Sequence, residues 1–198
     1  MTRCQSTENC RGIGEIMKKA IAVLVCAICV ASCGSSDIRT VKTGVLDFNK
    51  TLTVGQALDN WKNCKGSEWS EFTSDNGVKV VQFACDEKIE EYMAALRSVL
   101  PKGDKSASAL PSSDLKTFQF TLNKDGTFQL CNVSDLTKWA DGTENEQNQA
   151  AVEQLQSAYE NKMEYDMSVV DGLQKGNSDS EAAAEMLAVA FEFGKVTG

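Results

Sequence analysis

The stretch "TFQFTLNKDGTFQL", residues 117–130, has the pattern of a β-hairpin. Aromatic and aliphatic residues alternate with polar ones on both sides of "NKDG" (residues 123–126), whose composition favours a tight turn. Side chains of a strand alternate between its two faces, so the apolar residues of both strands share one face of the hairpin. These residues are Phe118, Phe120, Leu122, Phe128 and Leu130.

A second hairpin is predicted upstream, where residues 68–73 and 78–85 flank a turn-forming "SDNG" at 74–77. Val81, Phe83 and Cys85 share one face of the later strand by the period of two. In the earlier strand Trp69 and Phe72 are out of phase. We therefore expect a β-bulge there, or a strand that is buried on both faces.

Helical spacing of apolar residues surrounds these hairpins. Thr53 and Gln56 form a capping box for a helix expected over 54–65, with Trp61 and Cys64 on its inner face. Further helical stripes cover residues 89–100, 151–163 and 183–191. The Ser-, Gly- and Pro-rich residues 102–116 are predicted to form a surface connection. The expected fold is α+β: an antiparallel sheet of about four strands packed by an N-terminal helix, with additional C-terminal helices.

The parity of the cysteines predicts one disulfide. Cys85 lies on the apolar face of its strand and Cys64 on the apolar face of the predicted helix, whereas Cys131 has the opposite parity to Leu130. If the sheet packs on that helix, Cys64 and Cys85 meet and Cys131 points away. Closing a loop of about 20 residues would stabilise the fold by roughly 3 kcal/mol in the chain-entropy model.

The beginning of the chain is typical of an export signal. Lys18 and Lys19 precede an apolar run over 20–31, and the small residue Ser32 closes it. The run is shorter than the ~20 residues that a spanning helix needs, although a buried core helix remains an alternative. Met17 is a possible true start, because residues 1–16 show no helical or strand pattern.

The sequence Val30-Ala31-Ser32-Cys33 resembles the lipobox of bacterial lipoprotein precursors that signal peptidase II cleaves. The resemblance implies cleavage before Cys33, a diacylglycerol on its thiol and stable attachment to a membrane by several acyl chains such as palmitate. Gly34 follows in place of Asp, which by analogy would permit sorting to the periplasmic side of the outer membrane in bacteria with two membranes.

These observations divide the chain into three parts: a leader and lipoprotein signal peptide (1–32), a lipid-anchored tether (33–50) and a single α+β domain with a helical C-terminal part (51–198). The helix–hairpin unit at 53–85 also resembles a segment of small envelope lipoproteins of unknown function. Export to the cell envelope is a disulfide-permitting context, which agrees with the predicted cysteine pair.

Composition excludes several functions. The chain has no histidine, so Ser-His-Asp and Cys-His catalysis are absent, as is the commonest zinc ligand. With 28 Asp and Glu against 20 Lys and Arg, the net charge of −8 argues against nucleic acid as a partner. No catalytic, cofactor-binding or metal residue is assigned, and no cofactor is expected.

The sequence therefore favours a lipid-anchored cell-envelope protein that binds a partner protein or acts as a scaffold without catalysis. Two alternatives stay open: a carboxylate-based hydrolase of cell-wall or extracellular glycan, and capture of a ligand in a pocket between sheet and helix. The aromatic residues Trp61, Trp69, Phe72 and Trp139 could line a groove for glycan or peptide but are interpreted as core, although the sequence around Trp139 is typical of an exposed stretch. The carboxylate pairs open to the hydrolase are Glu68 with Glu71, Glu90 with Glu91, and Glu160 with Glu164 or Asp166.

Overall fold

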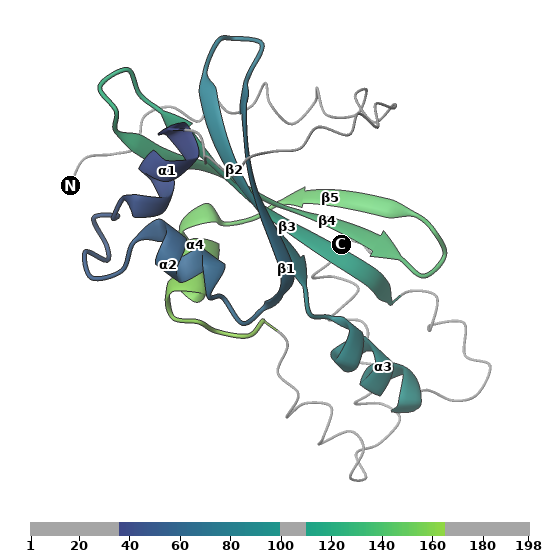
Figure 1. Cartoon of the computed structure of the whole chain (residues 1–198). Coiled ribbons are helices and arrows are strands. Elements are labelled where there is room, and N and C mark those ends of the chain that lie inside the picture. The colour runs from purple at the N-terminus through teal and green to yellow at the C-terminus, as the bar shows by residue number, and fades with distance from the viewer. Residues whose placement is uncertain (1–35, 100–109, 165–198) are drawn as a thin grey trace, which may run out of the picture.

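The computed structural model describes residues 36–99 and 110–164 (Figure 1). Within them one antiparallel sheet has five strands in the order of the chain, so each strand pairs with the next. The α+β class and the antiparallel sheet are confirmed, and the sheet has one strand more than the expected four. The strands are β1 (Cys64–Thr73), β2 (Lys79–Glu87), β3 (Pro111–Leu122), β4 (Phe128–Trp139) and β5 (Glu144–Asn148).

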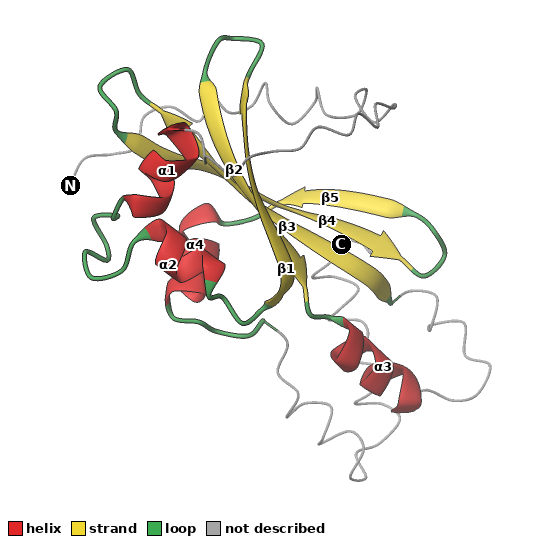
Figure 2. Cartoon of the chain, viewed as in Figure 1, coloured by secondary structure: helices red, strands yellow, loops and turns green. Residues whose placement is uncertain are grey.

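Of the four helices in the part of the chain that the structure describes, three cover one face of this sheet (Figure 2). They are α1 (Ser36–Thr43), α2 (Val54–Asp59) and α4 (Ala151–Tyr159), whereas α3 (Glu90–Val99) lies at one end of the sheet. Burying apolar side chains between the three helices and this face forms the core. Its largest members are Phe83, Phe118 and Phe120 from the strands and Leu58, Trp61, Leu155 and Tyr159 from the helical side.

The hairpin of β3 and β4 forms as predicted. Leu122 pairs with Phe128 and Phe120 with Leu130, and Gly126 has the positive φ of +84° that the turn requires. The register then shifts, because Gln119 lies opposite Asn132 and leaves Cys131 as the extra residue of a β-bulge.

The hairpin of β1 and β2 also forms, with Gly77 in its turn at a φ of +76°. The bulge expected between Trp69 and Phe72 is absent, because pairing is continuous there and the register shifts instead between Cys64 and Gly66. Trp69 packs on Phe83 with 5.0 Å between ring centroids, and Phe72 is exposed on the other face. Trp69 and Phe72 are three positions apart on a regular strand, so their rings lie on opposite faces of the sheet.

The helix expected over 54–65 is wrong at its C-terminal end. Its capping box is present, since Thr53 Oγ1 accepts from the Gln56 N–H and Gln56 Oε1 accepts from the Thr53 N–H. The helix stops at Asp59, however, and Cys64 already belongs to β1. Pairing of this segment along β2 outweighs the helical pattern of the local sequence.

Residues 36–50, expected as tether, contain α1 and contribute to the core. Val41 is 0 % exposed. A Cβ on Gly44 would lie 2.2 Å from the Phe128 ring, so the chain passes this aromatic side chain at close range. The expected tether therefore extends too far, because α1 packs against the sheet.

The long central strands change one further expectation and bear out another. The surface connection predicted over 102–116 ends earlier, since β3 begins at Pro111. Trp139 ends β4 and is buried at 2 % exposed, in agreement with its interpretation as core, whereas Phe72, also interpreted as core, is 36 % exposed. The stretches around Pro111 and Trp139 are rich in polar residues, but strand pairing satisfies their backbone groups.

The apolar helical face predicted over 151–163 is buried only in part. Leu155, Ala158 and Tyr159 of α4 are buried, whereas Val152 and Met163 are exposed. The predicted leader, Cys33 and the stripe at 183–191 lie outside the described residues, as does Asp166.

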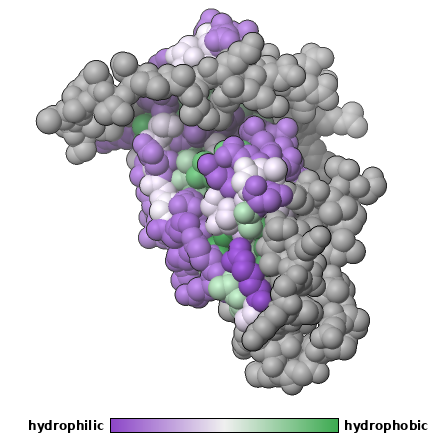
Figure 3. All heavy atoms as spheres, turned by 90° about the vertical axis from the view of Figure 1, so that its right-hand side faces the viewer, coloured by the Kyte–Doolittle hydropathy of each residue, from purple (hydrophilic) through white to green (hydrophobic). Residues whose placement is uncertain are grey.

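The surface seen from the right-hand side of Figure 1 is mainly hydrophilic, with hydrophobic residues in small areas between the polar ones (Figure 3). No helix within residues 36–99 and 110–164 is long and apolar enough to cross a membrane.

Candidate functional site

The inner face of the sheet changes from apolar to charged along β3. Phe120, Phe118, Lys116 and Asp114 share this face by the period of two. Register places Lys116 directly between Cys85 of β2 and Asp135 of β4. A lysine side chain is thereby held inside the molecule, and it is 1 % exposed.

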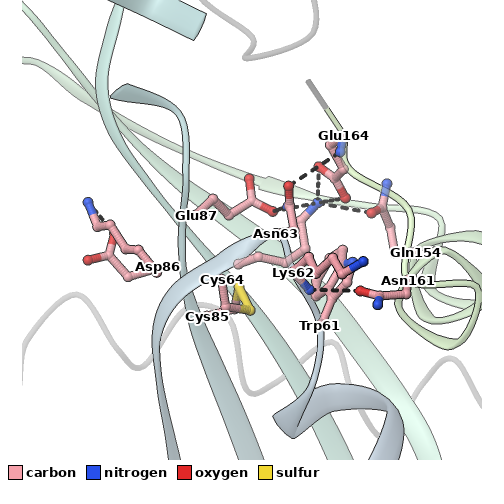
Figure 4. The surroundings of a disulfide bond; sticks show 12 residues. Trp61, Lys62, Asn63, Cys64, Cys85, Asp86, Glu87, Gln154, Asn161 and Glu164 are labelled. Atoms are coloured by element: carbon pink, nitrogen blue, oxygen red, sulfur yellow. Dashed lines mark hydrogen bonds and ion pairs between the residues drawn. A yellow bond between two sulfur atoms is a disulfide. The ribbon is translucent and has the colours of Figure 1, made fainter. Parts of the chain in front are cut away.

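Lys116 is the centre of a buried cluster of polar groups. Its Nζ donates to both carboxylate oxygens of Glu164, at 2.6 and 2.7 Å, and to Gln154 Oε1 at 2.9 Å. It also forms ion pairs with Glu87 at 3.4 Å and with Asp135 at 3.5 Å. Figure 4 shows Glu87, Gln154 and Glu164 pointing toward one another.

A second layer of contacts fixes these charged groups. Asn63 Nδ2 donates to Glu87 Oε1 at 2.7 Å, and Thr137 Oγ1 donates to Asp114 Oδ1 at 2.8 Å. The ammonium of Lys116 lies 5.9 Å from the centroid of the Trp61 ring, within cation–π range. The cluster is therefore closed on the side of the core by an aromatic ring.

Burial dominates the electrostatics of the cluster. It raises the pKa of Glu87 well above the usual range and that of Asp135 to about 7, and Lys116 offsets this only in part. Burial alone would lower the pKa of Lys116, but Glu87, Glu164 and Asp135 outweigh it and the pKa is raised. Lys116 therefore stays charged, whereas burial favours the protonated forms of Glu87 and Asp135.

Hydrogen bonds beside this cluster connect the segment after α4 to the segment before β1. Trp61 Nε1 donates to the carbonyl oxygen of Lys162 at 2.8 Å, and the Lys62 N–H donates to Asn161 Oδ1 at 2.8 Å. The Glu164 N–H donates to Asn63 Oδ1 at 3.3 Å. These bonds join residues about a hundred positions apart, so the cluster is first of all a tertiary cross-link.

The disulfide lies beside this cluster (Figure 4). Cys64 and Cys85 are bonded, with 5.3 Å between their Cα atoms, which is the predicted pair. The reason differs from the expectation: Cys64 begins β1 next to β2, and no helix carries it there. Cys131 is outside this bond and half-buried at the bulge of β4.

The carboxylate groups that could have served a hydrolase and that lie within the described residues are exposed or held in ion pairs, and Asp166 lies outside those residues. Glu68 and Glu71 are exposed on opposite faces of β1, and Glu90 and Glu91 are exposed in the first turn of α3. Glu160 pairs with Lys162, and Glu164 pairs with Lys116. Among the described residues no group of His, Cys, Asp or Glu could hold a metal ion.

Exposed apolar side chains gather beside α2 and α4. Phe48, 45 % exposed, contacts the ring of Tyr159 edge-on with 5.0 Å between centroids. Leu52 and Tyr159 line a groove of about 320 Å³ between the two helices. Val152, 54 % exposed, lies two turns before Tyr159 on the same side of α4. We call the exposed side chains of Phe48, Leu52 and Val152, together with the largely buried ring of Tyr159, the apolar patch.

A second hollow, of about 620 Å³, lies between α1 and the turns of the two long hairpins. Its lining includes Asp37 and Thr40 of α1, Lys79 of β2, and Asn123 and Lys124 of the β3–β4 turn. Lys79 Nζ and Asp37 form an ion pair at 2.6 Å across it. Asp37 is the only carboxylate among the described residues that line this hollow, so these residues offer no acid–base pair.

Sequence reasoning missed the Lys116 cluster. The parity of Lys116 with Phe118 is visible in "DLKTFQF" (114–120), and it marks the lysine as inward-facing. The three carboxylates come from distant parts of the chain, and no spacing rule connects them.

Comparisons of the chain with protein-family models, with curated proteins and with solved structures find no match.

Proposed function

We propose that the chain is a lipid-anchored protein of the bacterial cell envelope, whose folded domain binds another envelope protein and catalyses no reaction. The anchor is Cys33, at the end of the lipobox-like sequence. Several acyl chains on this residue would hold the domain at a membrane surface. Its polar, acidic exterior would then remain in the aqueous compartment.

The observation that carries the binding role is the apolar patch. Phe48 and Val152 are large apolar side chains with about half of their surface in solvent. Aromatic and aliphatic groups that cluster at the surface are typical of protein–protein contacts. Leu52 and Tyr159 add a groove next to them, into which an apolar side chain of a partner could pack.

A hydrolase has less support. Its acid and base would need two carboxylates about 5 to 9.5 Å apart beside a substrate cleft. One group of carboxylates that lie close together surrounds Lys116, where Glu87 is 0 % and Asp114 1 % exposed. A second group, Asp86 and Glu90, is occupied by ion pairs with Lys65. Neither of the two hollows described above contains such a pair.

Site-specific photo-crosslinking in intact cells of the source organism tests the binding role. A photoreactive amino acid replaces Val152 in one variant and Glu146, an exposed residue of β5, in the matched control. We expect one discrete crosslinked protein from position 152 and none from position 146. Phe48→Ser should weaken the adduct of the Val152 variant at least several-fold, because it removes the exposed ring that packs on Tyr159 in the apolar patch.

Two results would contradict the proposal. One is the same set of crosslinks from both positions, which would indicate random collisions. The other is hydrolysis of a glycan by the purified lipidated protein that is lost in a carboxylate-to-amide variant, with no crosslinked partner. Mass spectrometry of the N-terminal peptide tests the anchor separately, because acylation adds the mass of the lipid to Cys33.

A further inference from the structure

We infer that the β1–β2 and β3–β4 turns, together with the beginning of α1, form the end of the domain that contacts phospholipid headgroups. This inference rests on the proposed anchor at Cys33 and adds an orientation to it. It assigns a membrane-facing surface to one end of the sheet and leaves the other end in the aqueous compartment.

The first step is the length of chain between anchor and fold. Only Gly34 and Ser35 separate Cys33 from Ser36, the first residue of α1. Three residue steps span at most about 10 Å. Whatever conformation these residues take, the beginning of α1 would stay within about 10 Å of Cys33, the residue that would carry the lipid.

The second step is the position of α1 on the sheet. Asp37, in its first turn, pairs with Lys79 at the beginning of β2. Asp37 and Thr40 also line the hollow that Gly77 and Asn123 border from the two hairpin turns. The beginning of α1 therefore lies at the same end of the sheet as both turns, as Figure 1 shows.

The third step is the length of the sheet. β3 has 12 residues, so it extends about 40 Å from one end of the sheet to the other. The β4–β5 turn and α3 lie at the far end (Figure 1). A tether of about 10 Å cannot bring the far end to the membrane unless the domain lies flat.

The chemistry of the near end suits headgroups. Its turns read "SDNG" at 74–77 and "NKDG" at 123–126, with both charge signs and no large apolar side chain. Such turns can hydrogen-bond to phosphate and ester groups, but they gain nothing from entering the hydrocarbon. The lipid is therefore the part that inserts, and the turns rest on the surface.

Fluorescence quenching tests this orientation on the full, lipidated protein in phosphatidylcholine vesicles. In a Cys131→Ser background, a fluorophore is attached to Asn76→Cys, Lys124→Cys or Ala140→Cys, the last in the β4–β5 turn as matched control. Vesicles carry a spin label on their headgroups, and quenching of this kind acts over short distances. We expect at least three-fold stronger quenching at positions 76 and 124 than at position 140.

Each outcome is decisive for one of the two proposals. Lipidated protein with equal quenching at all three positions, or with the strongest quenching at position 140, overturns the orientation and leaves the anchor standing. Protein that carries no lipid on Cys33 and does not bind the vesicles overturns the anchor, and the orientation with it.

Discussion

Lys116 is a charged side chain on the inner face of a sheet, and three carboxyl groups surround its ammonium group. Removing one partner of a buried ion pair is far more costly than removing both, because the remaining charge loses its compensation. The contribution of Lys116 to stability therefore lies in neutralising Glu87, Asp135 and Glu164 in the fold.

Lys116→Met should lower the free energy of unfolding by about 3 to 5 kcal/mol at neutral pH, because it leaves buried carboxylates without their cation. Urea denaturation measures the change. The matched control is Lys138→Met, which removes a lysine with an exposed partner, Glu144, and should cost less than about 1 kcal/mol. Equal losses in the two variants would contradict the role of the cluster.

Asp135 should give the protein a stability that falls with rising pH. Its carboxyl group has a pKa of about 7 in the folded state and about 3.9 in the unfolded chain, so the folded state binds more protons between these values. Its contribution to the free energy of unfolding is largest below pH 4. It decreases by about 2 kcal/mol between pH 5 and pH 7.

Asp135→Asn should remove most of this decrease, which denaturation curves at pH 5, 6 and 7 would detect. The control Glu146→Gln removes an exposed carboxylate of β5 and should keep the slope of the parent protein. A slope that survives unchanged in Asp135→Asn would show that another group causes it.

The helices α1 and α2 approach each other closely at Gly55. A Cβ on Gly55, at the beginning of α2, would lie 2.8 Å from the carbonyl oxygen of Lys42 in α1. Gly55→Ala should therefore destabilise the fold by about 1 to 3 kcal/mol through crowding. Gly66→Ala is the matched control, since a Cβ there meets nothing within 4 Å, and thermal unfolding should distinguish the two.

The disulfide connects the first residue of β1 to the end of β2, closing a loop with a sequence separation of 21. Replacing Cys64 and Cys85 together by Ala should lower the free energy of unfolding by about 3 kcal/mol. Cys131→Ala leaves this bond intact and should change stability by less than about 1 kcal/mol. Denaturation with and without a reductant completes the test, because reductant should affect only proteins that keep the bond.

The strand β5 shows which elements a pattern of apolar residues cannot reveal. Its sequence, "ENEQN" (144–148), is entirely polar, because an edge strand can expose both its faces and one backbone edge to water. The turn before it carried a readable signal. Asp141 Oδ1 accepts from the N–H and Oγ1 of Thr143 just as Asp125 Oδ1 accepts from Thr127, so "DGT" marks both turns.

At the scale of the whole molecule, α1, α2, α4 and the sheet share one cluster of buried side chains. Small domains with one core usually unfold in a single transition. Leu155→Ala in α4 should therefore lower the free energy of unfolding by about 2 to 5 kcal/mol. Tryptophan fluorescence and far-ultraviolet circular dichroism should give the same shifted midpoint. Separate midpoints would show that α4 unfolds independently of the sheet.

The sequence alone determined the features that depend on neighbours along the chain. Alternation of apolar residues and turn composition predicted both long hairpins, and the shared parity of Val81, Phe83 and Cys85 placed one cysteine in the core. The capping box at Thr53 was likewise readable, since two residues that are three positions apart, Thr53 and Gln56, contain all of its atoms.

The tertiary structure decided where local preferences gave way. Because the chain pairs along β2, α2 ends at Asp59. Residues 36–43 of the expected tether form α1, because they pack on the sheet. Only the folded chain brings Glu87, Asp135 and Glu164 to Lys116, because contacts between distant segments leave no periodic trace in a sequence. Burial of that lysine is favourable only once all its partners are in place, so it is a property of the assembled fold.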